Sequence, residues 1–134
     1  MTDTLSVMTT DVISVNRETF VEEAIEIMVE NNVTGLPVVD DENRLVGIIS
    51  EKDVLKFLSD IDRLMLVKDF KDSSAKVEDF MTEKVISFDV NEDLIAICEC
   101  LVQNHFRRIP ILSEGKLAGI ISRKDVIKYI LEPI

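Results

Sequence analysis

The sequence contains an internal duplication, which constrains the fold more than any other feature. The segment GIISEKDVLKF at residues 47–57 returns as GIISRKDVIKY at 119–129. The dipeptide Met-Thr at 8–9 likewise recurs at 81–82, and one residue is lost in the later turn, where SEGK replaces DDENR. The chain is therefore expected to fold as two copies of one supersecondary unit, each of about fifty residues.

Each copy shows the same order of secondary-structure patterns. A β-branched run precedes a helical stripe of apolar residues, and two strand patterns joined by a turn lead to a closing helix. Thr19 and Glu22 have the spacing of a capping box at the first helix. One face of each striped helix is expected in the core. The stripes are Val21, Ala24, Ile25, Met28 and Val29 in the first copy, and Leu94, Ile97, Cys98, Leu101 and Val102 in the second.

The expected fold class is α+β, with two β-α-β-β-α repeats packed about a pseudo-two-fold axis. The repeats are expected at residues 7–60 and 77–131. Residues 61–76 are charged and end in DSSAK, which predicts a helical extension followed by a linker. A unit of about fifty residues is marginal alone, so the two copies are expected to share a core.

Composition excludes several classes of partner. The chain has 26 acidic and 15 basic residues and a net charge of −11, which argues against nucleic acid or an anionic membrane surface as a partner. No apolar run reaches the length that crosses a bilayer, and the N-terminus lacks the pattern of a signal peptide. These features predict a cytoplasmic protein.

The residues that could support catalysis or bind metal are sparse. Cys98 and Cys100 diverge on an expected helix, so neither a mutual disulfide nor, with His105, a metal site is predicted. The sequence has no glycine-rich phosphate loop, no Gly-x-Ser-x-Gly and a single histidine. It therefore predicts that the protein is not an enzyme and has no catalytic cofactor.

The repeated motifs resemble the cystathionine-β-synthase (CBS) domain, which usually occurs as a tandem pair called a Bateman module. The resemblance rests on the MT…VIS segments, the LPVVD and IPIL strands and, above all, the two Gly-Ile-Ile-Ser-x-x-Asp segments. It implies a regulatory module that senses an adenosine-containing ligand, AMP, ADP, ATP or S-adenosylmethionine, in a cleft between the copies. It also implies a homodimer of such modules.

Two Ser-x-x-Asp motifs supply the candidate binding residues. An ionised carboxylate accepts bonds from two neighbouring hydroxyls, so Asp53 and Asp125 are expected to hold the 2′ and 3′ hydroxyls of a ribose. Ser50 and Ser122, each at a helix N-terminus, are expected to face the phosphate or the ribose. The same motif is also a common helix cap, so capping alone is an alternative explanation, and the two roles are compatible.

Basic residues distinguish the second copy from the first. In the family, basic residues at the positions of Arg107, Arg108 and Arg123 often face ligand phosphates, which suits the two parallel donors of a guanidinium. The first copy has Thr34, Gly35 and Glu51 at these positions. The first copy therefore departs from the family's phosphate-binding pattern. The alternative for the arginines is an exposed basic edge that offsets an acidic surface.

The resemblance also implies an apolar adenine slot in each copy. Taken singly, most of the matching residues are of types that usually lie in a core. Phe106 is the best candidate because it is large and adjoins the arginines. The matching residues are Val12, Val33 and Pro37 in the first copy, and Val85, Phe106 and Pro110 in the second.

Two functions from different classes are consistent with these patterns. The first is a stand-alone module that senses an adenosine-containing ligand and signals in trans to an unidentified effector protein. The second is an oligomerisation or protein-interaction module with no small-molecule ligand. The arginine cluster separates them, because only the first function needs it.

Overall fold

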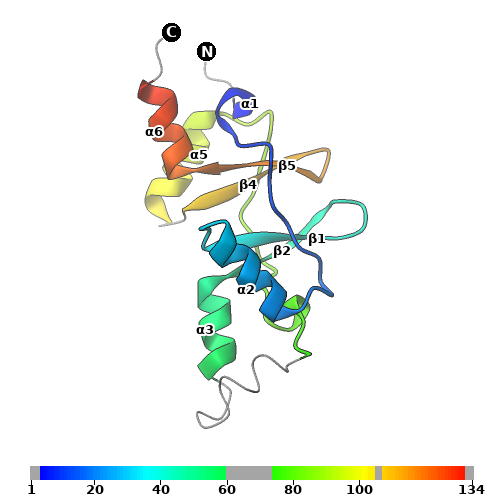
Figure 1. Ribbon diagram of the computed structural model, residues 1–134. Helices are drawn as coiled ribbons and strands as arrows, with labels where there is room; N and C mark the ends of the chain where they lie inside the picture. Colours follow the sequence, from blue (N-terminus) through cyan, green and yellow to red (C-terminus); the bar gives the residue numbers. More distant parts are fainter. Residues whose placement is uncertain (1–3, 60–73, 105–106, 132–134) are drawn as a thin grey trace. The chain divides into compact units, whose positions relative to one another are not determined.

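The computed structural model describes residues 4–59, 74–104 and 107–131, which form two compact units (Figure 1). We call Ile13–Val85 the first unit, and Met1–Val12 together with Ile86–Ile134 the second unit. Most of the segment 61–76, where a helical extension was expected, lies outside the described residues. Within the described part of the chain, no helix is both long enough and apolar enough to cross a membrane.

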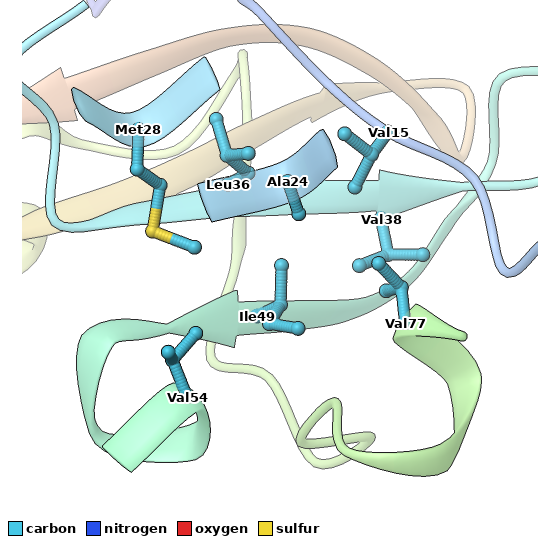
Figure 2. Packing of buried hydrophobic residues seen from close by; sticks show 8 residues of the cluster. All are labelled: Val15, Ala24, Met28, Leu36, Val38, Ile49, Val54 and Val77. Carbon is cyan, nitrogen blue, oxygen red and sulfur yellow. The ribbon is translucent and has the colours of Figure 1, made fainter. Parts of the chain in front are cut away.

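The first unit is built on an antiparallel hairpin of β1 (Gly35–Val39) and β2 (Leu45–Ser50). The helices α2 (Val21–Glu30) and α3 (Glu51–Ser59) pack against this hairpin, and the short 3-10 helix η2 (Val77–Asp79) adds a further side chain to the core. Figure 2 shows the apolar side chains of this core converging between the helices and the strands. They are Val15, Ala24, Met28, Leu36, Val38, Ile49, Val54 and Val77.

The second unit repeats this plan with one additional strand. The two-residue β3 (Phe88–Asp89) pairs in parallel with β4 (Arg108–Ser113), which pairs antiparallel with β5 (Lys116–Ser122). The helices are α1 (Thr4–Val7), α5 (Leu94–Gln103) and α6 (Arg123–Leu131). The buried core residues are Val7, Leu94, Ile97, Leu101, Ile109, Ile111 and Ile121. The expected α+β class is confirmed.

The Met-Thr segments, residues 8–9 and 81–82, each pack in the unit that contains the other copy's hairpin. Thr9 exchanges two backbone hydrogen bonds with Ile120 in β5, both of 2.9 Å. Thr82 exchanges two with Ile48 in β2, of 2.8 and 2.9 Å. Each unit is thus assembled from parts of both copies, which a reading of contiguous repeats does not reveal.

The repeated glycine of the final strand permits this close approach. A Cβ atom at Gly119 would lie 2.7 Å from Met8 Sδ and 2.9 Å from the Thr9 carbonyl oxygen. At Gly47 it would lie 2.9 Å from both the Met81 Sδ and the Thr82 carbonyl oxygen. Contacts this short are prohibited by van der Waals repulsion, so only glycine lets the Met-Thr segment lie against the strand.

The helical stripes are confirmed except at their last members. Val21, Ala24 and Met28 are buried, as are their counterparts in α5, whereas Val29 and Val102 are each 75% exposed. At about 100° per residue, the eighth residue after the first member of a stripe is rotated about 80° from that member, at the edge of the stripe. The expected first strand is also shorter than predicted, because Val15 forms only an isolated parallel bridge with Val38.

The predicted capping box at Thr19 and Glu22 is wrong. The helix α2 begins at Val21 after Phe20, which makes no side-chain cap. The Thr19 hydroxyl instead donates to Asn16 Oδ1 at 3.2 Å, and the backbone carbonyl of Ala75 accepts the Val21 N–H at 2.9 Å. A backbone carbonyl near the end of the 61–76 segment therefore takes the place of the side-chain cap.

The turn between β4 and β5 holds both of its residues in the left-handed conformation. Glu114 and Gly115 form a two-residue loop with φ values of +52° and +81°. Positive φ at both positions favours Asn followed by Gly. The first unit has Asn43 at a φ of +63° in its own longer turn.

We expect Glu114→Asn to raise the free energy of unfolding by about 1 kcal/mol, because asparagine tolerates the left-handed conformation that strains glutamate. Thermal or urea unfolding measures the change. The exposed Lys116→Ala in the adjoining strand is the control and should change stability by less than about 0.5 kcal/mol. An unchanged or lowered stability for Glu114→Asn would show that the left-handed conformation does not strain Glu114.

Gly119→Ala is expected to lower the free energy of unfolding by about 2 kcal/mol, because the added methyl group would overlap Met8 and the Thr9 carbonyl. The same unfolding measurement checks it, again with Lys116→Ala as the control in the same strand. Stability equal to that of the control would show that the Met-Thr segment does not lie against Gly119.

Candidate functional site

Each Ser-x-x-Asp motif lies where the last strand of a unit passes into its closing helix. In the second unit, the Asp125 N–H donates to Ser122 Oγ at 3.1 Å, and the Ser122 N–H donates to Asp125 Oδ2 at 2.9 Å. In the first unit, the corresponding bonds between Asp53 and Ser50 measure 3.3 and 2.9 Å. These reciprocal bonds form a capping box, so the capping role considered for both motifs is confirmed.

The carboxylate of each motif also contacts a threonine, which belongs to the Met-Thr segment of the other copy. Thr9 Oγ1 lies 3.2 Å from Asp125 Oδ1 and 3.4 Å from Oδ2. Thr82 Oγ1 lies 3.2 Å from Asp53 Oδ1. Both threonines are exposed and both aspartates are half-buried, so each hydroxyl donates to its carboxylate at the surface of the unit.

Capping leaves the carboxylates able to accept further donors. An ionised carboxylate has two oxygens and about four lone-pair positions, of which the capping box uses only part. The helix N-terminus also presents backbone N–H groups and a partial positive charge, which favour an anion. Each junction can therefore accept hydroxyl donors on the carboxylate and an anionic group near the helix.

The three predicted phosphate-binding arginines lie around Ser122 in the second unit. Arg108 pairs with Ser122 across β4 and β5, and the Arg123 N–H donates to the Arg107 carbonyl oxygen at 3.2 Å. In the first unit the same backbone arrangement joins Gly35 to Ser50 and Glu51 to Thr34, at 2.9 Å for the latter bond. The two junctions share a backbone plan and differ in charge.

Arg123 also has a structural contact that the sequence did not predict. Its guanidinium donates to the Leu101 carbonyl oxygen at 3.2 Å, near the C-terminal end of α5. A cation at this end of a helix is favoured by the partial negative charge of the terminal carbonyls. This bond directs one of the five N–H groups of the guanidinium toward α5.

The residues expected to form the adenine slots lie in different environments. Pro37 and Pro110 are buried within β1 and β4, while Val33 is half-buried just before β1. Val12 belongs to the second unit and Val85 to the first unit, so each lies in the unit of the other copy's hairpin. Phe106, and His105 beside it, lie outside the described residues.

Thr9 and Thr82 are the site residues that sequence reasoning missed. Their only signal was the recurrence of Met-Thr at equal positions in both copies, which marked the duplication but did not indicate a contact. The contact arises because each segment joins the other copy's hairpin. A pairing of that kind between distant residues cannot be inferred from periodicity within either copy.

The environment of Cys98 lowers the reactivity of its thiol. Burial, with a smaller contribution from the nearby negative charge of Asp93, raises the pKa of the Cys98 thiol above its ordinary value. A raised pKa leaves the thiol protonated at neutral pH, and the thiolate is the form that attacks electrophiles and binds metals. Over the described ranges, no group of three or more His, Cys, Asp or Glu side chains is arranged to hold a metal ion.

Ser122→Ala is expected to lower the free energy of unfolding by about 1 kcal/mol, since the alanine cannot accept the Asp125 N–H. Denaturant unfolding measures the loss, and Ser50→Ala should cost a similar amount because it makes the same cap. The exposed Ser113→Ala at the end of β4 is the control. If Ser122→Ala matches Ser113→Ala, the serine does not act as a cap.

Comparison with known proteins places this geometry in a family. The sequence model of the CBS domain family matches the chain twice, over residues 5–60 and 77–132. A crystal structure of CBSX2 in complex with AMP is 33% identical, with a TM-score of 0.81, and the match covers 98% of this chain and 97% of that one. CBSX2 is a protein of Arabidopsis thaliana.

Two relatives from Methanocaldococcus jannaschii are longer than this chain. MJ1225 is 36% identical over 124 residues, which cover 92% of this chain and 41% of the relative. Inosine-5′-monophosphate dehydrogenase is 36% identical over 119 residues, which cover 88% of this chain and 21% of the enzyme. The chain thus spans less than half of each of these two proteins. The two family matches and the shared fold establish that the chain belongs to the CBS domain family and contains a pair of CBS domains.

Proposed function

We propose that this CBS pair is a regulatory module that binds an adenosine-containing ligand, with AMP, ADP or ATP favoured and S-adenosylmethionine as a further candidate. The observation that carries the proposal is the half-buried Asp125 carboxylate, held by its capping box at a strand-helix junction where the backbones of Arg107 and Arg108 pair with those of Arg123 and Ser122. The relative solved with AMP matches this chain over nearly all of both chains, which supports the class of ligand.

The ribose is the part of the ligand that Asp125 would recognise. Two adjacent hydroxyls can each donate to one carboxylate oxygen, and bonds to an ionised acceptor are stronger than bonds between neutral groups. The capping box holds the carboxylate in one orientation before the ligand arrives. Preorganisation of this kind reduces the entropy lost on binding.

The phosphates would bind near Arg107 and Arg108, beside the N-terminus of α6. The guanidinium fork matches phosphate oxygens, and the helix N-terminus adds a favourable field. The first unit has Thr34, Gly35 and Glu51 at the matching positions, where the glutamate would repel a phosphate. We therefore assign the stronger nucleotide site to the second unit, and a weaker site or none to the first.

The proposed output is a change in conformation that an effector protein reads in trans. A ligand shifts a conformational equilibrium only through a difference in its affinity for the two states. The Met-Thr segments are suited to such a difference, because each contacts the carboxylate of a Ser-x-x-Asp motif and the chain then continues directly into the other unit.

A ligand-free interaction module is the second candidate function. Its specific support is that the capping boxes account for both Ser-x-x-Asp motifs without any ligand. Apolar side chains are also exposed on α6, at Ile127, Ile130 and Leu131. In this alternative the arginines form an exposed basic edge, and replacing them would change the binding of no small molecule.

Calorimetric titration of AMP, ADP, ATP and S-adenosylmethionine into the purified protein tests the proposal. We expect Asp125→Ala to weaken nucleotide binding by at least about tenfold, because charge-assisted bonds to the ribose are lost. Asp53→Ala is the matched control, since it removes the same kind of cap from the first unit. Asp53→Ala should lower the stability about as much as Asp125→Ala does, but it should weaken nucleotide binding much less.

Arg108→Ala, in the same titrations, tests whether the ligand phosphates bind near Arg107 and Arg108. This variant should weaken the binding of AMP and ATP while leaving that of adenosine nearly unchanged, because adenosine has no phosphate. The 260 to 280 nm absorbance ratio of the purified protein would also reveal co-purified nucleotide, since the chain has no tryptophan and one tyrosine. No binding of any of these compounds, with all variants folded, would reject the proposal in favour of the interaction module.

A further inference from the structure

The hydroxyl of Thr9 lies between the two oxygens of the proposed ribose-binding carboxylate. Its distances to Asp125 Oδ1 and Oδ2 are 3.2 and 3.4 Å, so neither oxygen is clearly preferred. A donor nearly equidistant from both oxygens occupies the edge of the carboxylate. That edge is where two adjacent ribose hydroxyls would donate two parallel bonds.

The other donor to the Asp125 carboxylate that the structure shows belongs to the capping box. The Ser122 N–H already donates to Oδ2 at 2.9 Å from the helix side. Replacing that bond would break one of the two reciprocal bonds of the capping box at the start of α6. The Thr9 bond is long and exposed, and is therefore the weaker of the two.

The backbone of Thr9 is firmly held while its side chain can rotate. Two 2.9 Å bonds to Ile120 fix the main chain, and the absence of a side chain at Gly119 lets it lie close to β5. The hydroxyl can leave the carboxylate by rotation about χ1, since the side chain is exposed. The Thr9 backbone is therefore fixed in position, while its hydroxyl can move away from the carboxylate.

We propose that Thr9 is a built-in competitor of the ribose, whose hydroxyl occupies the Asp125 edge and must rotate away for the ribose to bind there. This inference rests on the proposed function of the second unit. In the first unit, Thr82 donates to Asp53 Oδ1 at 3.2 Å and the Ser50 hydroxyl donates to Oδ2 at 3.0 Å. Protein donors thus engage both oxygens of Asp53, so competition there is at least as strong.

Thr9→Val tests the inference, because valine keeps the branched shape and lacks the hydroxyl. We expect the valine variant to bind AMP about three- to tenfold more tightly than the wild type, measured by calorimetry, because no internal donor is displaced. Thr9→Ser restores a hydroxyl and should return the affinity toward that of the wild type. Thr10→Val, at the exposed neighbouring residue, is the matched control and should change nothing.

A double-mutant cycle separates competition from a general structural effect. In an Asp125→Ala background, Thr9→Val should leave the residual affinity unchanged, because the threonine acts only through the carboxylate. Weaker or equal AMP binding by Thr9→Val, or a gain that persists without Asp125, would overturn the inference while leaving the proposed function intact. If neither the wild type nor Thr9→Val binds AMP, both the proposed function and this inference are rejected.

Discussion

The close approach of the Met-Thr segments to the final strands, permitted by Gly119 and Gly47, is the constraint on which the structure depends. A methyl group at either glycine would overlap a methionine sulfur and a threonine carbonyl. Because the glycines leave this space, the segment from one copy forms two backbone bonds to the strand of the other. Each unit is completed in this way by a part of the other copy, and the threonine hydroxyl is brought to the carboxylate.

The repeated Gly-Ile-Ile-Ser-x-x-Asp segment therefore combines several structural tasks in seven residues. Glycine admits the exchanged segment, serine caps the closing helix, and aspartate completes the cap while accepting the threonine hydroxyl. A carboxylate fixed by this many donors is held at one position and keeps acceptor capacity at the surface. The same properties make it suitable for recognising a ribose, so helix capping and the proposed binding role support each other.

Much of this fold could be predicted from the sequence because the duplication shows each pattern twice. The helical stripes, the hairpins and the Ser-x-x-Asp junctions were local features with a clear period, and the structure contains them. The cap of α2 was missed because a backbone carbonyl of Ala75 supplies it from more than fifty residues away. Thr9 and Thr82 were missed for the same reason, since their contacts are with the other copy. The proposed binding roles of the arginines and the adenine-slot residues stay predictions.

The asymmetry in charge gives the two junctions different expected affinities despite their common backbone plan. The central claim is that the ribose of an adenine nucleotide replaces the Thr9 hydroxyl on the Asp125 carboxylate. A crystal structure of the protein with AMP tests it most directly. We predict that the two ribose hydroxyls will lie on Asp125 Oδ1 and Oδ2, with the Thr9 side chain rotated away and its backbone bonds to Ile120 intact. AMP bound away from Asp125, or bound there with Thr9 still between the carboxylate oxygens, would contradict the account.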